Sequence, residues 1–177
     1  MEMTPHHQDS NQETPTLTPT VEKSGEGVRA LKFGVPTSEE LPVLAELFVE
    51  NVSLERSETP EILAKLMRLR ERLHVARTNG HILGFVTVEP DGPVRGAAYL
   101  RYLLVKPEFR RQGVGTALLQ QAHKMALGIS RSSLILRVDP SDEKAVAFVR
   151  KAGFTTVGAL SSKKSGKLRL LMSCELS

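Results

Sequence analysis

A short glycine turn between a strand and a helix constrains this chain more than any other feature of its sequence. Residues 110–115 read Arg-Arg-Gln-Gly-Val-Gly, an R-x-x-G-x-G pattern. Glycine adopts backbone angles that other residues avoid and lets the main chain approach a ligand closely. Because the turn opens into a helix, its first N–H groups lack partners within the helix, and the helix dipole adds roughly half a positive charge. The turn is therefore predicted to bind an anion such as a pyrophosphate.

The segments on both sides of the turn support this prediction. Residues 99–105 form an apolar run that is typical of a buried strand, and apolar residues from Val114 to Ile129 recur at helical spacing. Arg110 and Arg111 add positive charge at the rim, and Thr116 places a hydroxyl in the first helical turn. The spacing fits neither the dinucleotide-binding G-x-G-x-x-G pattern nor the Walker pattern.

A second strand and helix follow. Residues 133–138 are predicted to form a strand, and residues 139–142 a turn that supplies good helix N-cap side chains. A short helix is expected over residues 143–152, closed by Gly153. Another strand is expected to begin at residues 154–157.

The order of these motifs resembles the GNAT superfamily of acetyl-CoA-dependent N-acetyltransferases. The resemblance rests on Leu103-x-Val105-x-Pro107, on the R-x-x-G-x-G turn, and on the run L-x-V-x-P-S-D-x-x-A-x-x-F-x-x-x-x-G-F that ends at Phe154. It is specific over residues 99–154. It implies an α/β (α+β) fold, with a mixed, mostly antiparallel central sheet of six to seven strands flanked by about four helices. A splayed parallel strand pair would form the acetyl-CoA cleft.

The same resemblance implies which residues meet acetyl-CoA. The backbone of three strand residues would pair with the pantetheine arm, namely Leu103, Leu104 and Val105. The turn that Arg110 opens would hold the pyrophosphate through Arg111, Gln112, Gly113, Val114, Gly115 and Thr116. Asp142 stands where the family usually has an asparagine that meets the cofactor, and Phe148 would wall the cleft near the thioester.

The catalytic residues are less evident. Val149 stands where family members commonly have a tyrosine that protonates the departing CoA thiolate. Tyr102 is the candidate substitute for this acid, with a packed core tyrosine as the alternative. By family geometry, the backbone N–H of Leu104 is expected to meet the oxyanion. Glu89 is the first candidate for the base, followed by Asp91, whereas His81 and His123 are less favoured and a solvated surface role is open for all four.

The first half of the chain has weaker signals. A strand is predicted over residues 28–34, and residues 37–40 are predicted to cap a helix that runs to about Val52. Thr59-Pro60-Glu61 is expected to cap a second helix that runs through Leu73. Residues 73–78 and 82–88 then flank Asn79-Gly80, a dipeptide typical of a tight hairpin turn.

Composition divides the chain into two parts. Residues 1–27 are rich in Thr, Pro, Gln, Glu and Ser, which predicts a disordered acidic tail. This tail carries five acidic residues against Lys23, so the remaining 150 residues must carry +8 to give the net charge of +4. Residues 28–177 are predicted to form one N-acetyltransferase domain. Its basic surface is accounted for in part by a phosphorylated cofactor, which argues against nucleic acid as the partner.

Other features exclude several classes of protein. No run approaches the about 20 apolar residues of a membrane helix, so we expect a soluble cytoplasmic protein without a membrane partner. The single cysteine, Cys174, fits a reducing compartment and a packing role. No His/Cys cluster has metal-ligand spacing, so no metal is expected. A homodimer is left open.

Three functional hypotheses follow from the sequence. The first is an N-acetyltransferase that transfers an acetyl group from acetyl-CoA to a primary amine of a small molecule or peptide. The second is an acyl-CoA-binding domain with weakened catalysis, which the valine at position 149 suggests. The third is a basic module that binds nucleic acid, which rests on charge alone.

Overall fold

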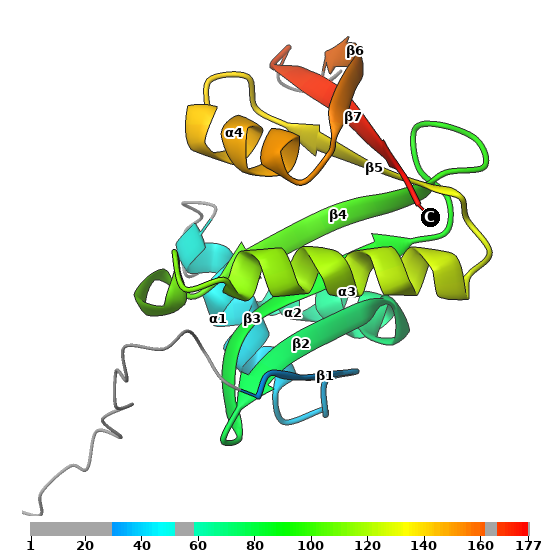
Figure 1. The fold of residues 1–177 in the computed structure, drawn as a ribbon. Coiled ribbons are helices and arrows are strands. Elements are labelled where there is room, and N and C mark those ends of the chain that lie inside the picture. Colours follow the sequence, from blue (N-terminus) through cyan, green and yellow to red (C-terminus); the bar gives the residue numbers. More distant parts are fainter. Residues whose placement is uncertain (1–29, 52–58, 162–165, 177) are drawn as a thin grey trace, which may run out of the picture.

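A twisted seven-stranded sheet forms the centre of the molecule (Figure 1). The computed structural model describes residues 30–51, 59–161 and 166–176. The strands are β1 (Lys32–Gly34), β2 (Leu73–Thr78), β3 (His81–Glu89), β4 (Ala98–Val105), β5 (Ser133–Val138), β6 (Thr155–Ser161) and β7 (Leu168–Glu175). The helices are α1 (Leu41–Asn51), α2 (Thr59–Leu69), α3 (Val114–Gly128) and α4 (Glu143–Lys151), with 3₁₀ turns η2 (Arg70–Arg72) and η3 (Pro107–Phe109).

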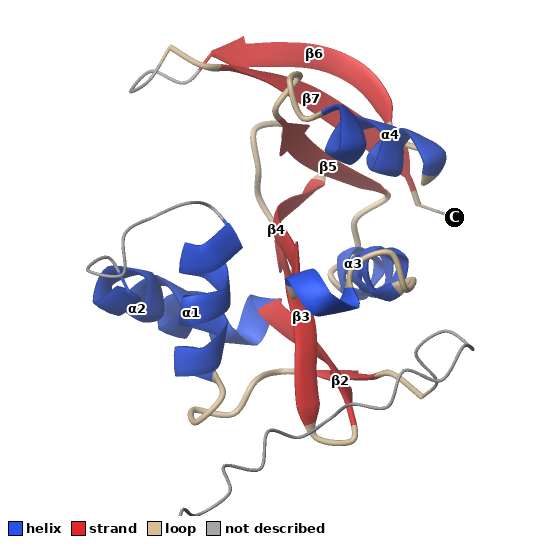
Figure 2. Ribbon diagram, turned by 90° about the vertical axis from the view of Figure 1, so that its left-hand side faces the viewer, coloured by secondary structure: helices blue, strands red, loops and turns tan. Residues whose placement is uncertain are grey.

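The sheet is antiparallel except at its centre. Its strand order is β1-β2-β3-β4-β5-β7-β6, and β4 and β5 are the parallel pair. Helices α1 and α2 lie on one face, whereas α3 and α4 lie on the other (Figure 2). This arrangement confirms the predicted fold class, including the parallel pair between two antiparallel halves.

Alternation along the strands divides the core between the two faces. On β3, Val86 and Val88 pack into the cluster formed with α3 and α4, whereas Phe85 packs into the cluster formed with α1 and α2. Side chains on a strand point to opposite faces in turn, so a central strand covered on both faces needs apolar residues at nearly every position. All nine residues of β3 except His81 are accordingly buried.

The predicted hairpin is confirmed, but the second helix is shorter than expected. Asn79 and Gly80 have φ angles of 48° and 78°, as a tight turn between two strands requires. Helix α2 ends at Leu69 rather than continuing through Leu73. Leu73 is fully buried in β2 and pairs with Thr87 of β3, so sheet pairing overrides the helical pattern at this point.

Some predictions concern residues outside the described part of the chain. These are the tail (residues 1–27), the first residues of the strand predicted over 28–34, and the end of the first helix at Val52. Within the described residues, no helix combines the length and apolar character that crossing a membrane requires.

Candidate functional site

The two parallel strands separate at the centre of the sheet. Strands β4 and β5 are paired from Ala98 with Leu134 to Leu100 with Leu136, and no further. Figure 1 shows the two ribbons diverging toward their carboxyl ends. Next along β4, Arg101 is the extra residue of a β-bulge, because Thr87 pairs with Tyr102 whereas Val88 pairs with Leu100. A bulge bends its strand and increases its twist, which is consistent with the separation of β4 from β5 at this point. We call the place where the two strands separate, directly after Leu100 and Leu136, the split.

Beyond the split, one edge of β4 has no strand beside it among the residues that the structure describes. Lys106 N–H donates to the Leu83 carbonyl over 2.8 Å, which marks a hydrogen-bonded pair of the antiparallel ladder. Such pairs alternate with non-bonded pairs, so the N–H of Leu104 is directed at Phe85 in β3. The N–H groups of Leu103 and Val105 are directed at the split. Beside Leu104, the residue expected to meet the oxyanion, it is thus the N–H of Leu103 that faces this space.

The glycine turn lies directly beyond the end of β4. Arg111 and Gly113 have φ angles of 62° and 82°, so the backbone reverses between them and leads into α3. Gly113 is the N-cap residue of α3, and within the described part of the chain no side chain caps the helix there. The first N–H groups of α3 are therefore available to a ligand, together with the dipole of a 15-residue helix. This is the anion-binding geometry that the sequence predicts.

The two arginines of the turn differ in their contacts. Arg110 Nε donates to the Val105 carbonyl over 3.2 Å, and its Nη2 donates to Asn51 Oδ1 at the end of α1. Arg110 thus ties the turn to β4 and α1. Arg111 is exposed, and within the described residues its side chain has no hydrogen bond or ion pair. Gln112 is engaged by the chain itself, because its side-chain amide donates to the Glu108 carbonyl over 2.8 Å.

Helix α4 closes the far side of the split. A Cβ placed on Gly115 would lie 3.5 Å from the Phe148 ring and 3.8 Å from Val105, so Phe148 reaches from α4 to the start of α3. Asp142 caps α4, because its carboxylate accepts the Ala145 N–H over 3.0 Å. Val149 is buried in the main core cluster. The structure thus brings Phe148 to the turn and leaves an aliphatic side chain at position 149.

The opposite face of the sheet carries a buried carboxylate at the split. Glu89 of β3 is 9% exposed, and both of its oxygens accept hydrogen bonds from the Arg101 guanidinium, with Nη2 to Oε2 at 2.8 Å. Beside it, the fully buried Thr87 hydroxyl accepts the Tyr102 N–H over 3.1 Å. Sequence reasoning identified Glu89 but not its ion pair, because the bulge that places Arg101 next to it leaves no local sequence signal.

Tyr102 packs against the helices of that face. Its ring meets Phe48 of α1 edge-on, with ring centroids 4.8 Å apart, and Lys65 Nζ lies 5.0 Å from the Tyr102 centroid. Tyr102 and Val149 consequently belong to clusters on different faces of the sheet. This supports the packing alternative for Tyr102.

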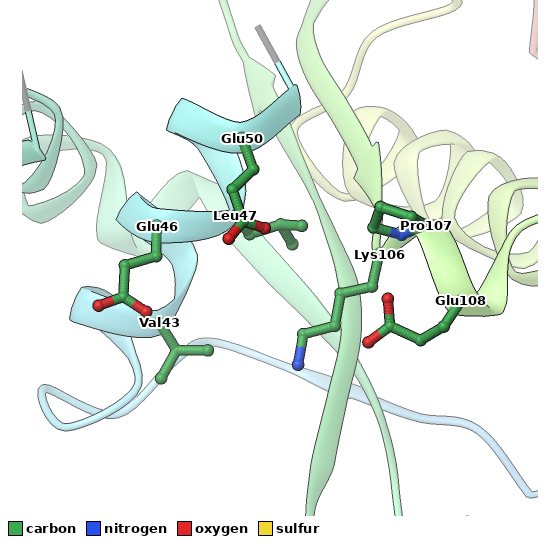
Figure 3. Close-up of a pocket in the computed structure, with 7 residues that line it drawn as sticks. All are labelled: Val43, Glu46, Leu47, Glu50, Lys106, Pro107 and Glu108. Carbon is green, nitrogen blue, oxygen red and sulfur yellow. The ribbon is translucent and has the colours of Figure 1, made fainter. Parts of the chain in front are cut away.

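A small pocket lies between α1 and the segment that follows β4 (Figure 3). Its volume is about 170 Å³, and it is lined by Val43, Glu46, Leu47, Glu50, Lys106, Pro107 and Glu108. Three carboxylates and one ammonium make this surface predominantly acidic. The pocket adjoins the residues leading into the glycine turn, whereas Leu100 and Arg101 of the split lie five or more residues earlier along β4.

The remaining candidates lie away from the split. Asp91 pairs with Arg131 over 3.3 Å, and His81 is exposed at the hairpin. His123 lies on α3 with its ring centroid 6.1 Å from that of Phe154. Cys174 is half-buried, and burial raises the pKa of its thiol. Among the residues that the structure describes, no three His, Cys, Asp or Glu side chains gather as metal ligands.

Known proteins resemble this chain in sequence and in fold. Residues 41–154 match the model of the acetyltransferase (GNAT) family. An acetyltransferase from Pectobacterium atrosepticum is 32% identical over 90 residues, which make up 51% of this chain and 62% of that relative. The match therefore spans less than two thirds of that relative's length.

Two solved structures illustrate the likeness in fold. Ard1 from Thermoplasma volcanium has a TM-score of 0.69 and 21% identity, with 84% of this chain and 99% of that chain covered. The protein yncA from Salmonella typhimurium, solved with its cofactor acetyl-CoA, has a TM-score of 0.66 and 13% identity, with 84% and 95% covered. At such identities the structures show the fold alone. Because the family model spans well over half of its residues, the chain belongs to the acetyltransferase (GNAT) family.

Proposed function

We propose that this acyltransferase moves the acetyl group of acetyl-CoA to a primary amine of a small molecule or peptide, by direct attack in a ternary complex. One observation carries the proposal. The parallel pair ends at Leu100 and Leu136, and β4 continues past the split into a glycine turn at an uncapped helix N-terminus. A backbone edge followed by an anion site suits an extended arm that ends in a pyrophosphate.

The cofactor contacts follow from this path. The pantetheine arm would pair with the edge of β4 at Leu103 and Val105, as an added strand does. The pyrophosphate would lie on the N–H groups of the turn that runs from Arg111 to Thr116, with the Arg111 side chain at its rim. Arg110 would position the turn rather than bind phosphate, because its guanidinium is held by Val105 and Asn51. Phe148 would wall the space between α4 and the turn.

Chemistry would take place at the split. A neutral amine attacks the thioester carbonyl, and the charge that develops on the oxygen would be met by the Leu103 N–H. An amine with a pKa of about 10 is mostly protonated at neutral pH, so its proton must be accepted. Glu89 is the buried carboxylate beside the split on the face that carries α1 and α2, and the acceptor would enter from this face, hereafter the acceptor side. Arg101 occupies two of the roughly four lone-pair positions of this carboxylate, which leaves about two for other donors. A water molecule bound at one of these would carry the proton from the amine to Glu89.

The leaving thiolate has no tyrosine near α4. Val149 offers no proton, which is the observation that favours the second hypothesis, an acyl-CoA-binding domain with weakened catalysis. A thiol with a pKa of about 8.5 nevertheless leaves without strong acid assistance. Tyr102 remains the candidate acid on the other face of the sheet.

Calorimetric titration with acetyl-CoA tests the cofactor site. Gly115→Glu places a carboxylate at the N-terminus of α3, and Gly115 lies outside the left-handed region, so the change does not strain the backbone as it would at Gly113. We expect micromolar binding by the natural chain and at least a 100-fold loss in Gly115→Glu. The matched control is Gly128→Glu at the other end of α3, where a Cβ meets nothing within 4 Å. Equal affinity in all three proteins would refute the site.

Turnover with an amine panel then tests the catalytic roles. Glu89→Gln is expected to lower kcat by about 10²–10⁴-fold. Tyr102→Phe keeps the ring against Phe48 and removes only the hydroxyl. A comparable loss in kcat would support Tyr102 as the acid, whereas unchanged kcat would assign it to packing. An unchanged kcat in Glu89→Gln would exclude that residue as the base.

A further inference from the structure

Two arginines lie beside the same tyrosine ring at the split, on the face that carries α1 and α2. Arg101 and Arg137 are the first residues of β4 and β5 beyond the last parallel pair, Leu100 with Leu136. Their guanidinium carbons lie 5.3 and 5.6 Å from the centroid of the same ring, that of Tyr99. The aromatic face attracts both cations and holds them beside the point where the strands separate.

These two charges have different partners. Arg101 is neutralised by Glu89 through two hydrogen bonds. Arg137 is exposed, and among the described residues its side chain forms no hydrogen bond or ion pair. The acidic residue nearest to it in sequence, Asp139, is itself engaged by Arg169 and by Ser141. One positive charge at the split is therefore left uncompensated within the described chain.

The position of Arg137 separates it from the proposed cofactor contacts. Leu136 and Val138 pack toward α3 and α4, whereas Ile135 clusters with Ala97 and Leu171 on the other face. Arg137 alternates with Leu136 and Val138, and its contact with Tyr99 places it on that other face. The uncapped end of α3 and Val149 belong to the α3/α4 side. A ligand of Arg137 would thus approach from the acceptor side rather than from the pyrophosphate side.

We propose that Arg137 binds a carboxylate of the acceptor, so that the acceptor is an amino acid. This inference rests on the proposed function. A guanidinium presents a planar fork of donors that matches a carboxylate, and the Tyr99 ring reduces the freedom lost on binding. The carboxylate would fix the molecule at the base of the split while its amine reaches the thioester further along β4. Arg101 is already engaged by Glu89 through two hydrogen bonds, so among the described residues Arg137 is the guanidinium at the split with donors left for the carboxylate.

The test compares acceptors that differ only in the carboxylate. The full-length protein with saturating acetyl-CoA is assayed, by loss of thioester absorbance, on the standard amino acids, β-alanine and γ-aminobutyrate. Each reactive amino acid is paired with the amine that lacks its α-carboxylate, such as lysine with cadaverine. We expect kcat/KM to favour the amino acid by about 10- to 100-fold, as for a charge-assisted hydrogen-bonded pair.

Variants assign the preference to Arg137. Arg137→Gln should lower the ratio of kcat/KM between amino acid and matched amine at least tenfold, mainly by raising KM for the amino acid. Arg137→Lys should retain part of this ratio, because it keeps the charge but loses the planar fork of donors. Arg150→Gln, an exposed arginine on α4, is the matched control and should keep the full preference.

Four results would overturn the inference. The first is an equal kcat/KM for amino acids and matched amines. The second is a fall in kcat in Arg137→Gln that is equal for both members of a pair, which would assign the arginine to the reacting thioester. The third is turnover of no amino acid in a protein that binds acetyl-CoA by calorimetry, which leaves the proposed function standing. Failure to bind acetyl-CoA would overturn the proposed function together with this inference.

Discussion

At the scale of single residues, His123 is an ionisable side chain whose burial opposes its protonation. Its Nε2 atom is buried and, within the described residues, has no hydrogen-bond partner. Burial lowers the pKa of this imidazole below its ordinary value. The folded chain therefore binds the proton less readily than the unfolded chain does.

This residue gives a prediction for stability against pH. Because the folded-state pKa is the lower one, the unfolded chain gains the proton first, and the free energy of unfolding falls as pH drops below about 6.5. The contribution is fully present above that pH. We expect thermal unfolding between pH 7.5 and 5.5 to show a smaller loss of stability in His123→Leu than in the natural chain. An identical loss in both proteins would contradict the prediction.

At the scale of elements, the start of α4 depends on its N-cap residue. Asp142 accepts the Ala145 N–H, a capping role that an asparagine could also fill. An ionised carboxylate only accepts hydrogen bonds, whereas an amide also donates them, so any contact that needs a donor is absent here.

Two substitutions separate capping from cofactor binding. Asp142→Ala should lower the free energy of unfolding by about 1 kcal/mol, since an N-cap is lost. Asp142→Asn should leave stability nearly unchanged and raise the affinity for acetyl-CoA, because the amide regains a donor. Denaturant unfolding and calorimetry measure the two effects. Equal stability of the alanine and asparagine variants would mean that this cap contributes nothing to folding.

At the scale of the whole molecule, the sheet consists of two antiparallel halves joined by a short parallel contact. The register between β4 and β5 covers only three residues on each strand, whereas β5 pairs with β7 over six. A cofactor lying between the two strands would contact both halves in the folded state alone. Acetyl-CoA should therefore stabilise the molecule against unfolding.

The ratio of ligand concentration to Kd sets the size of this effect. A ligand at 100 times its Kd contributes about 2.7 kcal/mol, and for a domain of this size each kcal/mol raises Tm by about 2–4 °C. We expect acetyl-CoA at that concentration to raise the Tm of the natural chain by about 5–10 °C and to leave the Tm of Gly115→Glu unchanged. A Tm increase of similar size in that variant would contradict binding at the glycine turn.

The sequence by itself determined the features that consecutive residues encode. The strand before the glycine turn, the long helix after it, the Asn79-Gly80 hairpin and the Asp142 cap all follow from backbone preferences and short-range hydrogen bonds. These local signals agree with the tertiary packing, so the fold class was predicted correctly.

Only the tertiary structure decided how distant segments meet. The register of β3 against β4 turns the Leu104 N–H toward β3 and leaves Leu103 facing the split. The bulge at Arg101 creates its ion pair with Glu89, and the parallel register that pairs Tyr99 with Ile135 brings Arg137 to the Tyr99 ring. Strand register and bulges depend on pairing between segments far apart in the chain. No local pattern of residues could therefore reveal which of these groups share the site.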